Sequence, residues 1–191
     1  TFYQLLDHDY HDWDIAAAPS LVHTRAGQQL VVAAGKDGHV YGTDRASGRR
    51  IYATPVSTIE NVDAPLTGMG ARFCPGVNGG VEWNGPSYSP HTNLLYVGSI
   101  DWCTTLSTVL PTQPGKLKGK EALPWTGSSK LRAPFGANEL ARRGWLTAID
   151  ADDGSIRWRY ASPTPLSVGL TSTAGHVVFA RDLNGNLLAF E

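Results

Sequence analysis

The sequence lacks an excess of charge of either sign. Its 191 residues include 16 Lys and Arg against 17 Asp and Glu, a formal net charge of −1. Proteins that bind nucleic acid usually carry a basic surface, so this balance argues against that class. The sequence also lacks an apolar run approaching the about 20 residues of a membrane-spanning helix, and this argues against a helical membrane protein.

Cysteine is scarce as well, and only Cys74 and Cys103 occur. They do not form a C-x-x-C pair, the spacing that zinc sites and redox centres commonly use. Their surroundings, RFCPG and SIDWCTT, leave two possibilities open from the residues alone: a disulfide, or two unreactive thiols. The cysteines by themselves therefore do not assign the chain to a compartment.

Glycine and proline, in contrast, are plentiful, with 21 and 12 residues, and helical periodicity is weak throughout. Apolar stretches rich in β-branched and aromatic residues predict strands. They are LVVAAG (30–35), VYGT (40–43), LLYVGS (94–99) and VVFA (177–180). The turn sequences KDG, ASG, DDG and LNG supply residues that tolerate positive φ. The sequence therefore predicts an all-β chain of short antiparallel strands.

An internal repeat organises these strands. The segments 33–52 and 144–160 share one plan: a strand, a small residue, an acid, a Gly turn, and a strand with an aromatic residue. The segment 179–191 repeats its first half. Ala148 and Ala189 occupy the same place in two copies and lie 41 residues apart, about the length of one four-stranded propeller blade. We therefore expect one domain over residues 1–191, with about three blades of a β-propeller.

One stretch interrupts the pattern. Residues 110–136 contain Pro, Gly, Lys and Ser without a period, and predict an inserted surface loop. Because about three blades cannot close a ring, we expect the chain to be part of a longer protein that would be inactive as this piece alone.

The stretch HDYHDWD, residues 8–14, has two histidines and three aspartates beside an apolar run. Such a density of titratable groups suits a metal site, a catalytic base with its supporting residues, or a solvated polar loop. The composition of the stretch does not decide among them.

Four segments resemble the PQQ-dependent (quinoprotein) dehydrogenases of the alcohol, methanol and glucose type. AIDADDGSIRW has the spacing of their tryptophan-docking motif, and WDIAAAP resembles their catalytic loop. FCPGVNGGVEWNGPSYSPHTNLLYVGSIDWC resembles the long Cys-to-Cys segment of the alcohol and methanol enzymes, and TSTAGHVVFARDLNGNLLAFE a later blade. The resemblance runs from about His8 to Glu191. It implies part of the C-terminal half of an eight-bladed propeller that surrounds pyrroloquinoline quinone (PQQ).

The resemblance also implies roles in the opening stretch. Asp14, directly after Trp13, matches the family's general base, which takes the alcohol's hydroxyl proton as a hydride passes to the quinone. It is also a candidate calcium ligand, since lanthanide-using relatives carry a second Asp where this sequence has Ala16. The remaining His and Asp residues of the stretch would support the loop or face solvent.

Further positions match cofactor contacts. Lys36, before a turn, would contact the quinone oxygens. Glu82 and Trp83 fall where relatives contact PQQ, but relatives often have Asn in place of Glu82. A carboxylate would repel the tricarboxylate cofactor unless it is protonated or paired, so Glu82 would act through Lys36 or face the substrate. Relatives that oxidise methanol have a Trp near the position of Ser167, and its absence weakens a methanol-specific interpretation.

Compartment and partners follow from the same resemblance. Cys74 and Cys103 match positions that are disulfide-bonded in methanol-type relatives, and a bridge would imply the periplasm, in solution or at the membrane. The substrate would be an alcohol or sugar, and the electron acceptor a cytochrome c or a membrane quinone. Two alternatives remain: a non-catalytic propeller scaffold of the outer-membrane assembly type that binds protein partners, and a metal-dependent hydrolase built on HDYHD.

Overall fold

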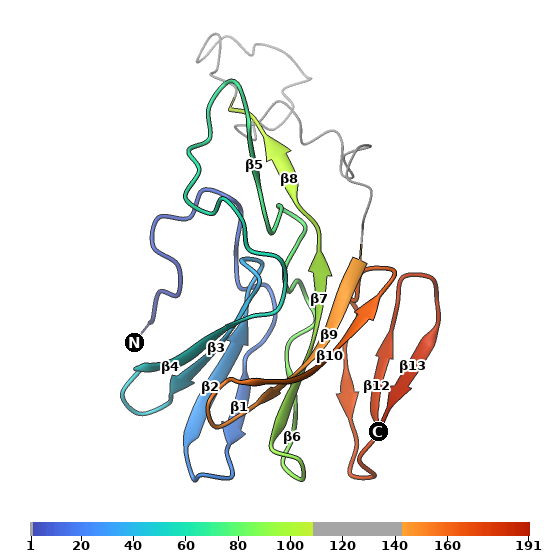
Figure 1. Cartoon of the computed structure of the whole chain (residues 1–191). Helices are drawn as coiled ribbons and strands as arrows, with labels where there is room; N and C mark the ends of the chain where they lie inside the picture. The colour runs from blue at the N-terminus through green and yellow to red at the C-terminus, as the bar shows by residue number, and fades with distance from the viewer. Residues whose placement is uncertain (1, 109–142) are drawn as a thin grey trace, which may run out of the picture.

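The computed structural model describes residues 2–108 and 143–191, and its regular elements in these ranges are all β-strands. The loop insertion expected at 110–136 lies outside the described residues. Three antiparallel sheets stand side by side like the leaves of a fan (Figure 1). Among the described residues there is no helix long and apolar enough to cross a membrane.

The first sheet is a four-stranded meander in chain order, β1-β2-β3-β4. Inward-facing residues alternate with exposed ones along β2, because successive side chains of a strand point to opposite faces. The strands are β1 (Ser20–His23), β2 (Gln29–Ala34), β3 (His39–Asp44) and β4 (Arg50–Pro55).

The second sheet has the order β6-β7-β9-β10, and β7 pairs with β9 along eight residues of each strand. β7 continues into a small two-stranded sheet of β5 and β8, which extends beyond the blade (Figure 1). The strands are β5 (Ala71–Phe73), β6 (Ser87–Ser89), β7 (Leu94–Asp101), β8 (Thr104–Leu106), β9 (Arg143–Asp150) and β10 (Ile156–Ser162).

The third sheet has three strands, β11 (Thr171–Ser172), β12 (Val178–Arg181) and β13 (Leu187–Phe190). Its first strand contacts β6, and β6 also contacts β1, so the first strands of the three sheets line one edge of the fan. The four strands expected from the apolar stretches all form, as β2, β3, β7 and β12. The prediction of an all-β, partial propeller of about three blades is confirmed.

The repeat is visible in the turns as well as in the strands. Gly48 donates its N–H to the carbonyl of Asp44 at 2.9 Å, and Gly154 donates to Asp150 at the same distance. Both glycines have positive φ, at 72° and 77°, a conformation that costs residues with a Cβ atom free energy. The two copies of the repeat therefore use one turn geometry.

Aromatic rings join consecutive sheets. A Cβ atom built on Gly42 would lie 2.2 Å from Tyr52, and one built on Gly154 would lie 2.4 Å from the same ring. The ring of Tyr52 thus fills the space between its own sheet and the β9–β10 turn of the next. At the following interface Trp158 stacks with Phe190, with ring centroids 5.9 Å apart, as expected for blade-to-blade packing.

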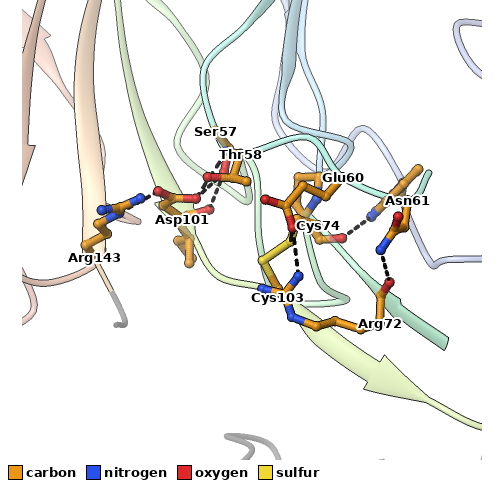
Figure 2. The surroundings of a disulfide bond; sticks show 12 residues. Ser57, Thr58, Glu60, Asn61, Arg72, Cys74, Asp101, Cys103 and Arg143 are labelled. Carbon is orange, nitrogen blue, oxygen red and sulfur yellow. Dashed lines mark hydrogen bonds and ion pairs between the residues drawn. A yellow bond between two sulfur atoms is a disulfide. The ribbon is translucent and has the colours of Figure 1, made fainter. Parts of the chain in front are cut away.

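The disulfide implied by the resemblance is present. Cys74 and Cys103 are bonded, are separated by 29 residues, and have Cα atoms 4.4 Å apart. Cys74 also exchanges two backbone hydrogen bonds with Glu60, at 2.9 and 3.0 Å, and Glu60 pairs with Arg72 at 2.7 Å (Figure 2). The bridge ties the end of β5 to the start of β8 and so anchors the segment between them.

Candidate active site

The HDYHDWD stretch forms an ordered loop. The carboxylate of Asp9 accepts hydrogen bonds from the backbone N–H groups of His11, at 2.9 Å, and Trp13, at 2.8 Å. The buried ring of His11 stacks on the buried ring of Trp13, with centroids 3.9 Å apart. Trp13 in turn donates its indole N–H to the carbonyl of Pro75 at 3.2 Å, beside the disulfide. With Trp13 held inward, the two aspartates on either side of it are exposed.

Lys36 is the cation of this site. It lies in the turn between β2 and β3, and its backbone N–H donates to the carbonyl of Asp14 at 3.2 Å. Its ammonium lies 2.8 Å from the Asp12 carboxylate and 3.6 Å from the Asp14 carboxylate. The Lys36 side chain is only 7% exposed, whereas those of Asp12 and Asp14 are 70% and 59% exposed. The loop and the turn therefore bring a buried ammonium against two accessible carboxylates.

The surrounding acids keep Lys36 charged. Burial alone would lower its pKa, but the hydrogen bond to Asp12 and the charges of Glu82, Asp12 and Asp14 outweigh burial and raise the pKa above its ordinary value. A protonated lysine at this point can donate hydrogen bonds to an electron-rich oxygen.

Glu82 reaches the same site from the second blade. Gly80 packs so closely on Lys36 that an added Cβ would lie 2.2 Å from the lysine carbonyl oxygen. Val81 then donates its N–H to the carbonyl of Gly35 at 3.0 Å. These two contacts seat the chain before β6 against the β2–β3 turn and bring Glu82 next to Lys36.

The Glu82 carboxyl group has a pKa close to neutral pH. Its side chain is buried, and within the described part of the structure its Oε1 atom has no hydrogen-bond partner. Burial raises the pKa of Glu82 to about 7; Lys36 opposes the rise, and Asp14 and Asp12 add to it. A carboxyl group with this pKa is partly protonated at neutral pH, and its protonated form can donate a hydrogen bond.

A cavity of about 470 Å³ opens beside Glu82. Its walls are mainly apolar, and among the residues described Glu82 is its one ionisable lining residue. Trp83 stands at its rim with 74% of its surface exposed. The predicted contact between Trp83 and the cofactor therefore stays a prediction, and in this structure Trp83 lines the cavity. The other apolar lining residues are Ile100, Trp102, Pro165 and Leu183.

A second, more polar cavity of about 360 Å³ lies on the other side of the loop, against Asp9 and His11. Asp37 in its wall accepts hydrogen bonds from the Tyr41 hydroxyl and the His39 ring. Across residues 2–108 and 143–191, no three His, Cys, Asp or Glu side chains lie close enough together to hold a metal ion. Within the described residues, the stretch therefore supplies no complete metal site of its own.

The structure brings three of the predicted site residues together. Asp14 and Lys36 meet directly, and Glu82 joins them from the next blade. Sequence reasoning gave Asp12 only a supporting or solvated place, yet it makes the closest contact with Lys36. It also missed Asn84, whose amide donates to the carbonyls of Gly98, at 2.7 Å, and Leu166, at 3.1 Å. The stretch GGVEWNG could have indicated Asn84, because an amide side chain follows the acid by two residues.

The chain as a whole is similar to known dehydrogenases. Residues 2–69 match the family described as glucose/ethanol/alcohol dehydrogenase, beta-propeller domain. The quinoprotein ethanol dehydrogenase of Pseudomonas aeruginosa is 26% identical over 222 residues, which cover 100% of this chain and 33% of that protein. A 1-butanol dehydrogenase (cytochrome c) of Thauera butanivorans is 26% identical over 182 residues, covering 86% of this chain and 26% of that protein.

Solved structures show the same fold. A europium-containing methanol dehydrogenase superposes with a TM-score of 0.73 at 22% identity, covering 99% of this chain and 37% of that one. The quinohemoprotein alcohol dehydrogenase of Comamonas testosteroni gives 0.66 at 23% identity, with 90% and 28% covered. The chain spans about a third of the length of the curated relatives it matches. These matches confirm the predicted resemblance: the chain has the fold of part of a β-propeller and is similar to quinoprotein alcohol dehydrogenases.

Proposed function

We propose that this chain supplies one wall of the active site of a PQQ-dependent dehydrogenase that oxidises an alcohol. The observation that carries the proposal is the contact of a buried ammonium, Lys36, with two accessible carboxylates, Asp12 and Asp14. A non-catalytic scaffold has no need to bury a lysine among acids, because burying a charge costs free energy even when it is paired.

The residues present fit the cofactor's quinone end. Lys36 offers a protonated donor, and Glu82 offers a buried carboxyl oxygen that lacks a partner in the described structure. When bound, PQQ supplies the electron-accepting carbonyl that takes a hydride from the alcohol carbon. Lys36 would hold the quinone oxygen and stabilise the charge that develops there.

Asp14 would act as the general base. Its carboxylate is accessible, as a base that must reach a substrate hydroxyl has to be, and the nearby Lys36 ammonium compensates its charge. Asp12 would anchor Lys36 through the shorter of the two ion pairs, so that Asp14 remains available to take the proton.

Calcium, the acceptor and the compartment belong to the same proposal. Asp14 would give one carboxylate ligand to Ca²⁺, with the other ligands from beyond the described residues. Several relatives are named for cytochrome c or as quinohemoproteins, which supports a cytochrome c acceptor, with a membrane quinone as the other candidate. The disulfide between Cys74 and Cys103 suits the periplasm.

The test uses the complete protein that carries this chain. The purified apoprotein would be loaded with PQQ and Ca²⁺ and assayed for dye reduction with a panel of primary alcohols and with glucose. We expect turnover with alcohols that depends on added PQQ. If the protein bound PQQ but reduced no dye with any alcohol, the proposed function would be wrong.

A further inference from the structure

We propose that His91 and His176 form a surface site for a divalent transition-metal ion such as Zn²⁺, which links the second sheet to the third. The site lies away from the candidate active site, and it does not depend on the proposed function. The observations behind it are the distance between the two rings, the contacts that hold their turns, and the chemistry of imidazole.

The two histidines come from different sheets. His91 lies in the turn between β6 and β7, and His176 lies in the turn between β11 and β12. Their ring centroids are 5.2 Å apart, and the ring planes meet at 74°. Both residues are exposed, so an ion in solution can reach them. Two imidazole rings from separate parts of the chain therefore meet at one point of the surface.

The distance between the rings suits a shared metal ion. Zinc binds imidazole nitrogen at about 2.0–2.1 Å in tetrahedral geometry, so two rings on one zinc ion have centroids about 5 Å apart. The separation of 5.2 Å matches this value. Because both side chains are exposed, rotation about χ1 and χ2 can turn one nitrogen of each ring toward the ion. No group of three His, Cys, Asp or Glu side chains forms among the described residues, so water would fill the remaining positions.

Contacts between β6 and β11 hold the two turns side by side. The Ser87 hydroxyl lies 3.0 Å from the Ser172 hydroxyl and accepts the Ser172 N–H at 3.1 Å. The Ser172 hydroxyl donates to the carbonyl of Tyr88 at 3.0 Å. Each of these strands leads directly into one of the histidine turns. The two turns are therefore in place before an ion binds, which lowers the entropic cost of binding.

The His176 turn is also closed by its own hydrogen bonds. The Thr173 hydroxyl donates to the carbonyl of Val177 at 2.9 Å, and the His176 N–H donates to the carbonyl of Thr173 at 3.2 Å. His176 has a positive φ of 65°, which is uncommon outside glycine but which His adopts more often than most residues. The backbone that carries the ring is thus fixed.

The chemistry of the pair selects the class of ion. Neutral imidazole binds Zn²⁺, Cu²⁺ and Ni²⁺, whereas Ca²⁺ and Mg²⁺ prefer oxygen ligands. Arg25 donates to the carbonyl of His91 at 3.2 Å, and its positive charge opposes a bound cation. We therefore expect an affinity below that of a structural zinc site with four protein ligands, and no binding of Ca²⁺.

The site is remote from Lys36. The N–H of Arg25, in the turn before β2, donates to the side-chain oxygen of Asn93 in the His91 turn at 2.9 Å. Lys36 lies in the turn after β2, at the opposite end of that strand. A metal ion on the histidine pair would therefore stabilise the contact between two sheets without touching the candidate active site.

The first experiment measures Zn²⁺ binding by calorimetry to the complete protein, purified without a histidine tag. We expect saturable binding that His91→Ala and His176→Ala each weaken about tenfold or more, because each variant removes one of the two protein ligands. His23→Ala is the matched control, since His23 is an exposed histidine at the end of β1 beside the same turns, and it should leave the affinity unchanged. Ca²⁺ should not compete with Zn²⁺.

A second readout locates the ion without a variant. Diethyl pyrocarbonate modifies free imidazole nitrogen, and a bound metal ion blocks this reaction. We expect Zn²⁺ to protect His91 and His176, but not His23, as measured by mass spectrometry of peptides. Zn²⁺ should also raise the urea midpoint of the wild type more than that of His176→Ala, because an ion that binds the folded protein stabilises it.

The outcomes separate this site from the proposed function. Equal Zn²⁺ affinity in the wild type and both histidine variants, or modification of His91 and His176 that Zn²⁺ does not reduce, would overturn the site. Weakened Zn²⁺ binding in both variants, with alcohol oxidation as in the wild type, would support it. Neither result bears on whether the protein loaded with PQQ oxidises alcohols.

Discussion

Lys36 makes its closest ion pair with Asp12, at 2.8 Å, and stands 3.6 Å from Asp14. The two aspartates flank the buried Trp13, and Asp12 reaches its place with a positive φ of 69°. In the proposed mechanism, the two similar residues would have different tasks. Asp12 would anchor the Lys36 ammonium, and Asp14 would keep its carboxylate open to the substrate.

The division predicts unequal effects of removing the two charges. Asp14→Asn should lower kcat by about 10²–10⁴, the range for loss of a general base, and leave PQQ bound. Asp12→Asn should lower kcat less than Asp14→Asn does, by about tenfold. In this variant Lys36 loses its ion pair with residue 12, but the general base remains. Dye-reduction kinetics of the PQQ-loaded complete protein, with cofactor content measured by absorbance, would check both. Equal losses in the two variants would contradict the division.

Lys36 should govern cofactor affinity. Lys36→Ala is expected to raise the Kd for PQQ by about tenfold or more, the effect of losing a charge-assisted hydrogen bond. Lys36→Arg should restore part of the loss. Titration of the complete apoprotein with PQQ would give these values, and Arg49→Ala, an exposed cation in the next turn, is the control. Unchanged affinity in Lys36→Ala would make the lysine a structural residue only.

Glu82 should make stability depend on pH. Its pKa in the folded protein is raised to about 7, from 4.5 in the unfolded chain. Below about pH 4.5 both the folded and the unfolded protein hold this proton, so Glu82 does not lower the free energy of unfolding. As pH rises toward and through 7, the unfolded chain has already lost the proton that the folded protein retains, and stability falls. The substitution Glu82→Gln removes this pH-dependent loss of stability, because Gln does not titrate.

The variant and the wild type should therefore unfold alike near pH 4. At pH 8, Glu82→Gln should be more stable by up to about 3 kcal/mol, given the size of the shift. Urea denaturation of the complete apoprotein at both pH values would measure this difference. A variant that is less stable than wild type at pH 8 would show that Glu82 is ionised and paired in the folded protein.

The disulfide should contribute substantially to stability. In the chain-entropy model, a bridge across 29 residues stabilises the folded state by about 3–4 kcal/mol. The double variant Cys74→Ser/Cys103→Ser should lose about this amount in urea denaturation. Mass spectrometry of non-reduced peptides from periplasmic material should find the two cysteines linked, and two alkylatable thiols would contradict the bridge and the compartment together.

The repeat made much of the fold predictable. The acid, the Gly turn and the aromatic residue recur at fixed spacing, and the matching hydrogen bonds of Gly48 and Gly154 show that two turns sharing only the Asp and the Gly adopt the same geometry. Lys36 and Asp14 could be paired because each lies in a segment that resembles a known one. The side-chain contact itself, at 3.6 Å, follows from the turn and loop that the sequence pattern marked.

Other parts of the site were beyond the sequence. Asp12 precedes a buried Trp in a loop without periodicity, so nothing in the sequence told which aspartate would turn toward Lys36. The apolar cavity joins Trp83, Ile100 and Leu183, which are far apart in the chain and have no shared motif. Only the angle between neighbouring blades brings these three side chains around one space.

The ring of Tyr52 contributes to the packing between the first two blades. Inserted between Gly42 and Gly154, the ring separates the first sheet from the β9–β10 turn of the second. Lys36 lies on the first blade and Glu82 lies in the segment that enters the second, so the packing of Tyr52 between these blades is expected to affect how these two side chains are placed relative to each other. A substitution at Tyr52 would therefore be expected to alter the geometry of the candidate site, although every residue of that site would stay the same.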